Sequence, residues 1–474
     1  METPFFTPSY LARSSNLADS QLINLFPTVV ETHNGSAIGA FYMTPGLDLK
    51  ATVGTGPIRG MLPVTSLQLC VVSGSSVYVV DTNWNATLCG TMATSTGPVS
   101  IITNNRQTNI FDGQAGYLLT GTTLAPLTMP FGNPTFATYQ DDFGLVIFAG
   151  TNLCAESNAG DLSIYNALNF TAFDALPGNA VSIGTLNEQL WAINETDTEI
   201  WADQGLAGFS FARVSGALIE RGSAAAYSLA KVGDYLMMVS RNLAGVGEVV
   251  LGAPYTWTRI STHALEAEMA TWPTLSDIVG FGYQQEGHLF YQMTSPSGNA
   301  TWVYDLTTSE QLKIPCWHKR ASFLNGQFNR HWANCYAFFN GSRVVGDYQN
   351  GNLYAYDLDT ATDNGTQRKW LRMWRALPQP SRAPVRFPPL TIAMETGAQV
   401  PDGTNPQVVL RWTDDGGHNF SDEHFRPAGK TGETAHRVKW NRLGSTRRNS
   451  GLDRYFELSS SDPFKVALLG AYLE

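Results

Sequence analysis

Charged residues are scarce in this sequence, and several features that define large classes of proteins are absent. Asp, Glu, Lys and Arg make up only 15% of the 474 residues, well below the usual quarter. No uninterrupted apolar run of about 18 residues occurs, so we expect no membrane-spanning helix. The N-terminus also lacks a basic segment followed by an apolar one, so we expect no export signal.

Cysteine is rare too, which argues against a disulfide framework and against a zinc site. The count is five, an odd number, and no two cysteines form a C-x-x-C pair. Free thiols in a protein folded in a reducing cytosol are therefore expected. Walker, dinucleotide-binding and G-x-S-x-G motifs are missing as well, and we expect neither a metal nor a cofactor. The five cysteines are Cys70, Cys89, Cys154, Cys316 and Cys335.

Short strands joined by tight turns are what the abundant residues favour. The sequence holds 44 glycines and 11% aromatic residues, which suit turns and pleated surfaces respectively. One theme recurs from about residue 60 to 360, as in 69–81, 287–305 and 351–357, where two strands flank a turn and the second ends near Asp. The spacing of roughly 30 to 55 residues is typical of propeller blades. We predict an all-β fold with six or seven small antiparallel sheets; stacked β-sandwiches are the alternative.

The two ends differ from this central part. Residues 1–59 are punctuated by prolines, which exclude long helices and central strands, and we predict an extended arm. Residues 361–389 form a basic, proline-rich connector between the propeller of 60–360 and a β-sandwich module over 390–474. The strands predicted in that module are Gln407–Trp412, Arg437–Leu443, Tyr455–Ser459 and Val466–Leu473.

Charge divides the chain in the same way. Residues 1–360 hold 14 Lys and Arg against 28 Asp and Glu, a net charge of −14. Residues 361–474 hold 16 against 12, a net charge of +4. This asymmetry predicts two regions with different neighbours.

The stretch VVLRWTDDGGHNF, residues 408–420, resembles the Asp box of sialidases. Asp415 can accept hydrogen bonds from its own turn, while Gly416 and Gly417 permit positive φ. We interpret these three residues as a structural turn with Phe420 packed beneath it. A glycan-cleaving enzyme would also need paired carboxylates across a pocket and an arginine cluster, and arginine is scarce in the propeller part.

A basic run over 437–448 contains Arg437, Trp440, Arg442, Arg447 and Arg448. It could contact nucleic acid phosphates or form ion pairs at a subunit interface. Because the whole chain is acidic, the interface is preferred. The histidines nearby match no metal-binding spacing, and we interpret them as surface residues: His418, His424 and His436.

Two stretches carry a family resemblance. The first runs PSYLARSSN from Pro8, QLINLFPTVVE from Gln21, YMTPGL from Tyr42 and GPIRG from Gly56. The second is the D-G-G turn, VKWNRLG from Val438, RRN from Arg447 and the closing strand after SSDP. Both resemble the packaged-DNA stabilisation proteins, the tail hub or nozzle proteins of short-tailed bacteriophages. The two ends, about 60 and 70 residues, carry the likeness, whereas the middle agrees only in its β-rich style and its length.

The resemblance implies a structural protein of the virion tail, not an enzyme, made and folded in the cytoplasm of the bacterial host. Its relatives form a ring, usually of six copies, that continues the DNA channel below the portal and its adaptor and retains the genome until ejection. The implied partners are further copies of the chain, the head-to-tail adaptor, plug or needle and fibre or spike proteins, and packaged double-stranded DNA without sequence-specific contact. The alternative is a propeller protein at the tail tip that cleaves glycans or binds a carbohydrate or receptor.

Charge and resemblance together suggest a layout. An acidic channel wall would repel DNA phosphates and let the duplex slide, although the acidic surface could equally face outward. The expected interface residues lie in the arm and in the C-terminal module: Arg13, Asn24, Pro27, Arg437, Trp440, Arg442, Arg447 and Arg448.

Overall fold

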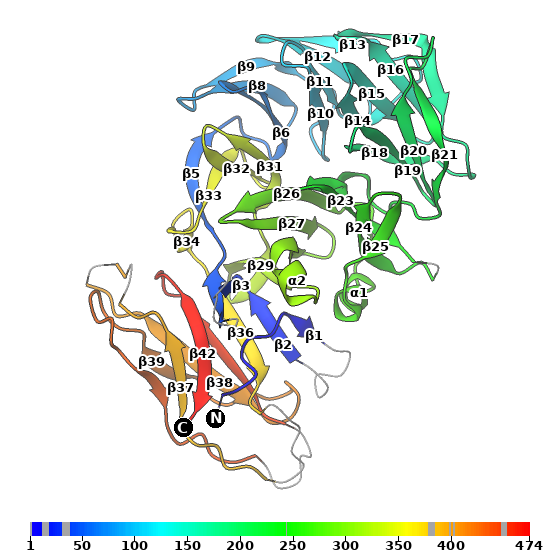
Figure 1. Cartoon of the computed structure of the whole chain (residues 1–474). Helices are drawn as coiled ribbons and strands as arrows, with labels where there is room; N and C mark the ends of the chain where they lie inside the picture. Colours follow the sequence, from blue (N-terminus) through cyan, green and yellow to red (C-terminus); the bar gives the residue numbers. More distant parts are fainter. Residues whose placement is uncertain are drawn as a thin grey trace.

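The computed structural model describes residues 2–11, 19–30, 38–242, 244–377, 384–397, 400–401, 403–446 and 453–474. Seven small antiparallel sheets follow one another around a ring, and a β-sandwich lies beside it (Figure 1). The prediction of an all-β fold with six or seven small sheets and a C-terminal sandwich is confirmed, and the number of blades is seven. Short helices interrupt the strands at η1 (Ala226–Ser228), α1 (His263–Met269) and α2 (Leu306–Leu312). No helix in the described ranges is long and apolar enough to cross a membrane.

The first five blades each consist of four consecutive strands. Tight turns join the first two strands, as at Asp141 and Asp142, whose φ angles of 48° and 68° match the turns that suit twisted hairpins. The strands are β6 (Ile58–Thr65), β7 (Gln68–Ser73), β8 (Ser76–Asp81) and β9 (Ala86–Thr91); β10 (Ser100–Thr103), β11 (Thr108–Phe111), β12 (Gly116–Thr120) and β13 (Thr123–Leu127); β14 (Pro134–Gln140), β15 (Phe143–Phe148), β16 (Leu153–Asn158) and β17 (Asp161–Ala172); β18 (Ala180–Leu186), β19 (Gln189–Asn194), β20 (Thr198–Asp203) and β21 (Phe211–Ile219); and β22 (Ala230–Val232), β23 (Tyr235–Arg241), β24 (Gly247–Ala253) and β25 (Thr256–Arg259).

The last two blades complete the ring with help from the N-terminal segment. Blade six consists of β26 (Val279–Gln285), β27 (His288–Ser295), β28 (Ala300–Asp305) and β29 (Trp317–Leu324), with β30 (Gln327–Arg330) beside β29. Blade seven takes β31 (Ala333–Phe339), β32 (Ser342–Asp347) and β33 (Asn352–Asp357) from the end of the propeller and β5 (Gly46–Thr52) from before its beginning. The first strands of the seven blades contact one another in order, and β31 meets β6. The pairing of β5 with β33 therefore closes the ring.

The sandwich also draws on the N-terminal segment. One of its sheets has the order β2-β36-β41-β38-β39 and continues through β2 into β29 of blade six; the other has the order β3-β4-β42-β37-β40. The strands of these sheets are β1 (Tyr10–Leu11), which pairs with β2, β2 (Asp19–Ile23), β3 (Leu25–Val30), β4 (Ile38–Met43), β36 (Trp370–Arg375), β37 (Leu390–Met394), β38 (Gln407–Thr413), β39 (His424–Pro427), β40 (Val438–Trp440), β41 (Tyr455–Ser460) and β42 (Ala467–Leu473). Two short strands between the domains, β34 (Thr362–Asp363) and β35 (Thr366–Gln367), extend the sheet of blade seven beyond β5.

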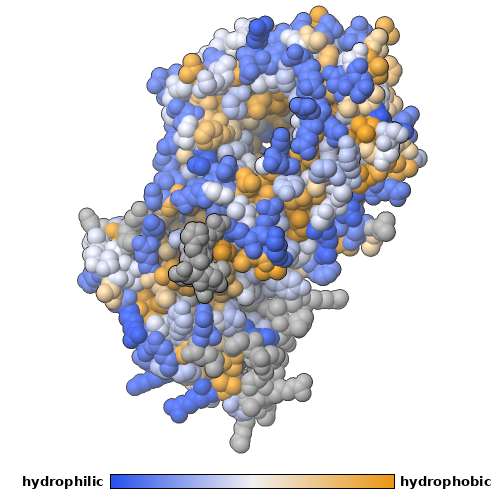
Figure 2. All heavy atoms as spheres, viewed as in Figure 1, coloured by the Kyte–Doolittle hydropathy of each residue, from blue (hydrophilic) through white to orange (hydrophobic). Residues whose placement is uncertain are grey.

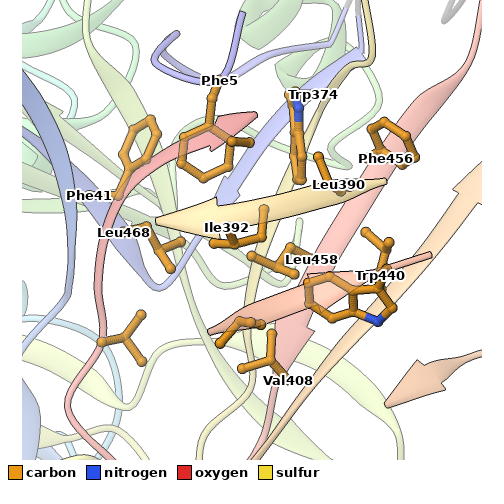
Figure 3. Close-up of a cluster of buried hydrophobic side chains, with 14 of the residues drawn as sticks. Phe5, Phe41, Trp374, Leu390, Ile392, Val408, Trp440, Phe456, Leu458 and Leu468 are labelled. Carbon is orange, nitrogen blue, oxygen red and sulfur yellow. The ribbon is translucent and has the colours of Figure 1, made fainter. Parts of the chain in front are cut away.

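The sandwich core fills the space between these two sheets (Figure 3). Phe5 and Phe41 from the N-terminal segment pack with Trp374, Leu390 and Phe456. Large aromatic side chains bury about 150–250 Å² each, so this cluster is a major source of stability for the domain. The residues that the sequence suggested as a separate arm therefore form part of the sandwich itself.

The structure thus corrects the prediction that prolines exclude central strands from residues 1–59. β4 pairs with strands on both sides, as β5 does. The prolines are accommodated because Pro27 lies in β3, an edge strand, and Pro45 lies between β4 and β5. The structure also places β36, inside the predicted connector, at the centre of a sandwich sheet, between β2 and β41.

Three of the four strands predicted in the C-terminal module are confirmed as β38, β41 and β42. The strand predicted over Arg437–Leu443 is shorter, because β40 covers only Val438–Trp440. Arg442 has a φ of 61° and Gly444 a φ of 73°, and this left-handed backbone ends the extended segment. On the face shown in Figure 2, hydrophilic and hydrophobic residues are interspersed over both domains.

Candidate functional site

The Asp-box-like sequence forms the loop between β38 and β39. The Asp415 carboxylate accepts hydrogen bonds from the Thr413 hydroxyl at 2.8 Å, from the Asn419 backbone N–H at 2.9 Å and from the Asn419 side-chain amide at 2.7 Å. Hydrogen bonds from Asn419 are the main cause that lowers the Asp415 pKa to about 2. Gly416 and Gly417 have φ angles of 72° and 88°. Both carboxylate oxygens are thus used within the turn.

The residues beside this turn connect it to the rest of the sandwich. Arg454 forms two hydrogen bonds of 2.7 Å with the Asp414 carboxylate, a bidentate geometry, and its side chain is only 2% exposed. Phe420 packs against a cluster that contains Ile23, Met373 and other residues from blade six and the sandwich. The prediction that Phe420 would pack beneath its own hairpin is therefore incomplete, because the phenyl ring of Phe420 also contacts residues that join the two domains.

Three of the predicted interface residues have buried side chains with partners in their own chain. Asn24 is 1% exposed; its side chain donates 2.8 Å hydrogen bonds to the backbone oxygens of Ala321 and Lys369 and accepts one of 2.9 Å from the Ala321 N–H. Pro27 is buried in β3. Trp440 is 1% exposed, and its indole donates to the His424 carbonyl at 2.8 Å. In this structure these side chains hold parts of one chain together.

Two predicted interface residues are exposed. The Arg437 side chain is 67% exposed, and its guanidinium lies 3.6 Å from Glu474. Glu474 also accepts a 2.9 Å hydrogen bond from Lys439, which is the first cause that lowers the Glu474 pKa. Arg442 is exposed in the turn after β40. The other three predicted interface residues lie outside the described residues: Arg13, Arg447 and Arg448.

A set of buried arginines at the domain junction was not anticipated. Arg368 donates 2.6 Å hydrogen bonds to the carbonyls of Thr44 and Pro45, and Arg320 donates to Pro45 at 2.7 Å. Arg372 donates to the Phe5 carbonyl and to the Ser20 hydroxyl at 2.8 Å. Burial lowers the pKa of Arg368 to about 10 and that of Arg372 to about 9. Part of the C-terminal positive charge is therefore internal and fastens the N-terminal segment.

Arg372 could have been found by its position in the sequence. In WLRMWR, residues 370–375, side chains alternate between the two faces of a strand, so Arg372 shares a face with Trp370 and Trp374. All three side chains are 0% exposed. Counting the alternation would have predicted an arginine in the core instead of a basic surface.

A cavity of about 240 Å³ lies on the propeller axis. It is lined by first strands of the blades and by the segment around Tyr227. The Arg59 guanidinium, at the wall of this cavity, donates hydrogen bonds to backbone oxygens, including those of Gly97 at 2.6 Å and Thr94 at 2.8 Å. The Tyr227 hydroxyl donates to the Thr135 carbonyl at 2.9 Å. Burial lowers the pKa of Arg59. Within the described ranges, no group of three or more His, Cys, Asp or Glu residues is arranged to hold a metal ion.

The fold defines a two-domain β protein, a seven-bladed propeller with a β-sandwich into which its own N-terminal segment is built. Two family models match the sequence: one described as bacteriophage P22 Gp10, beta-propeller, over residues 1–361, and one described as bacteriophage P22 Gp10, beta-sandwich, over residues 369–473. The chain belongs to this family, and it is a structural protein of the phage tail. The resemblance drawn from the sequence is confirmed.

Other comparisons add little about function. No curated protein matched the sequence. Solved structures with similar folds are the N-terminal domain of Nup159 (9% identity, TM-score 0.39, covering 75% of this chain and 99% of that one), the Pan2 WD40 domain of Neurospora crassa (7%, 0.43, 66% and 96%) and virginiamycin B lyase from Staphylococcus aureus (10%, 0.40, 63% and 94%).

Proposed function

We propose that the chain is a ring-forming hub or nozzle subunit that extends the DNA channel below the portal and adaptor and helps to retain the packaged genome until ejection. The observation that carries this proposal is the match of both family models, which together cover nearly the whole chain. The role needs no catalysis, and both oxygens of the one enzyme-like carboxylate, Asp415, are used by its own turn. The proposed partners are other copies of the chain, the adaptor, a plug, needle, fibre or spike protein, and DNA that passes without sequence-specific contact.

The division of charge supports a layout for such a ring. The acidic propeller, within the region of net charge −14, would line or surround the channel, where its carboxylates repel DNA phosphates. The sandwich, with exposed Arg437 and Arg442, would dock to the adaptor or to a neighbouring subunit. Direct phosphate contacts of residues 437–448 with duplex DNA would contradict this layout.

Electron microscopy of the purified protein, alone and bound to virions, tests the proposed function. A ring on the tail axis, with six copies as the expected number, would support it, whereas monomers bound away from the axis would overturn it. Arg442→Glu should weaken ring formation by reversing a charge at the proposed interface. Arg106→Glu, at an exposed turn of blade two, is the matched control and should assemble normally.

A further inference from the structure

Of the seven histidines in the described ranges, three are buried where the propeller meets the sandwich. They are His288 in β27, His318 in β29 and His331 just after β30. Phe26, on the sandwich strand β3, packs into a core cluster made mostly of residues from blades six and seven. Its ring centroid lies 5.4 Å from that of His288 and 6.3 Å from that of His318. Two histidines of blade six therefore flank the aromatic ring by which the sandwich is inserted into the propeller.

These two histidines differ in the hydrogen-bond partners of their ring nitrogens. Nδ1 of His288 lies 2.8 Å from the buried Asp305 carboxylate, and its Nε2 lies 3.4 Å from the Thr28 hydroxyl. Both ring nitrogens of His288 thus have a hydrogen-bond partner. Among the described residues, neither ring nitrogen of His318 has a hydrogen-bond partner, although the residue is only 1% exposed. A proton on His318 would therefore be a buried cation without an acceptor.

The charged groups around His318 make protonation still less favourable. Arg320 lies two residues along the same strand, and both Arg320 and His288 oppose a positive charge on His318. Arg320 itself stacks on Tyr356 and donates to Pro45, while Arg368 from the connector adds a second buried guanidinium. The buried carboxylates are Asp363, which is 3.6 Å from Arg368, and Asp305, which is bonded to His288 and Thr308. Both carboxylates already have partners.

His331 is a third buried histidine under the influence of Arg320. Its Nδ1 accepts a hydrogen bond from the Ala333 N–H at 3.2 Å, and its Nε2 has no partner in the part of the chain that the structure describes. Arg320 and Arg368 both oppose a positive charge there. Burial lowers the pKa of His331 well below its usual value and that of His318 to about 3.

We propose that the propeller–sandwich junction is an acid-sensitive latch, in which neutral His318, assisted by neutral His331, keeps Phe26 and strand β3 seated, and proton uptake releases them. The direction follows from linkage. The unfolded histidine binds a proton below about pH 6.5 and the native one only near pH 3, so the closed junction has its full stability above pH 6.5 and loses it as the pH falls from 6.5 toward 3. At pH 5, proton uptake by His318 alone shifts the equilibrium between the closed and the open junction toward the open form by about 30-fold.

Native-state hydrogen exchange at pH 7.5 and pH 5.0, corrected for intrinsic exchange rates, tests the latch on the full chain. We expect the protection of amides in β3 and β29 to fall by about 30-fold or more at pH 5.0, while amides in β7 of blade one keep theirs. His318→Phe preserves a ring between Phe26 and Phe290 but cannot titrate, and it should remove about 30-fold of that loss. His263→Gln, a change at a side chain that is 79% exposed, is the control and should leave the loss unchanged.

Two outcomes would overturn the proposal. One is an equal loss of protection in β7 and β3, which would mean that acid acts on the whole fold. The other is an unchanged loss in His318→Phe. If the phenylalanine ring does not fit and the variant fails to fold, His318→Leu gives the same readout with a smaller side chain.

Discussion

Phe5 provides a direct test of whether the N-terminal segment is an integral part of the sandwich. Phe5 is 3% exposed, and its ring centroid lies 4.8 Å from that of Trp374 and 5.6 Å from that of Phe41, both in edge-on geometry. A buried phenylalanine removes about 150–250 Å² from water, worth about 4–6 kcal/mol at about 25 cal/mol per Å². Phe5→Ala should therefore lower the stability of the sandwich by about 4 kcal/mol, within the usual range for such truncations.

The assay must separate the two domains, because a chain of this size need not unfold in one step. Native-state hydrogen exchange of amides in β42 should accelerate by about a thousandfold in Phe5→Ala, whereas amides in β7 should change little. Leu11→Ala removes a side chain that is 38% exposed and should change neither. An acceleration of less than about tenfold in β42 would refute the conclusion that the N-terminal segment is part of the sandwich core.

Three further changes test other parts of the structure. Asp415→Ala should destabilise the sandwich by about 1 kcal/mol through the lost turn hydrogen bonds, seen as a lower urea midpoint, and Asp422→Ala at a nearby exposed position should not. Gly46→Ala should prevent normal closure of blade seven, because a Cβ at this position would lie 2.1 Å from the Thr360 backbone oxygen. The melting temperature should therefore fall by several degrees. Gly178→Ala is the control and should be neutral, because the nearest atom to its Cβ would lie 3.6 Å away. Asn24→Asp loses both amide donations at the junction and should make exchange in β2 at least tenfold faster; unchanged exchange would contradict the role given to Asn24.

The repeated hairpins could be predicted from sequence because they depend on local signals. Alternating apolar residues and turn residues with positive φ lie close together in the chain, and both follow from local sterics. The closing strand of blade seven could not be predicted in this way. β5 resembles any other short strand, and its partner β33 lies about 300 residues later, so only the packed ring identifies the pair.

The same distinction between local and long-range contacts decides which features of the candidate site could be predicted. The hydrogen bonds of the turn at Asp415 span only four residues, to Asn419, so a turn of this kind can be proposed from sequence alone, and the structural role of Asp415 stays a prediction. The inward direction of the Asn24 and Trp440 side chains depends on which sheet each strand joins, and neither the charge distribution nor the family resemblance contains that information. Arg442, in contrast, is exposed, and its role at an interface remains a prediction.

The pairing of β5 with β33 also governs when the protein can fold during synthesis. At about 5–20 residues per second, the ribosome needs about 15–60 s after making β5 to deliver its partner. Through this interval blade one lacks its neighbour, blade seven. The sandwich strand β4 is without its partner β42 for still longer, because β42 is made near the end of the chain. A chain whose translation stops before blade seven can neither close the ring nor cover these strands, which leaves it open to proteases.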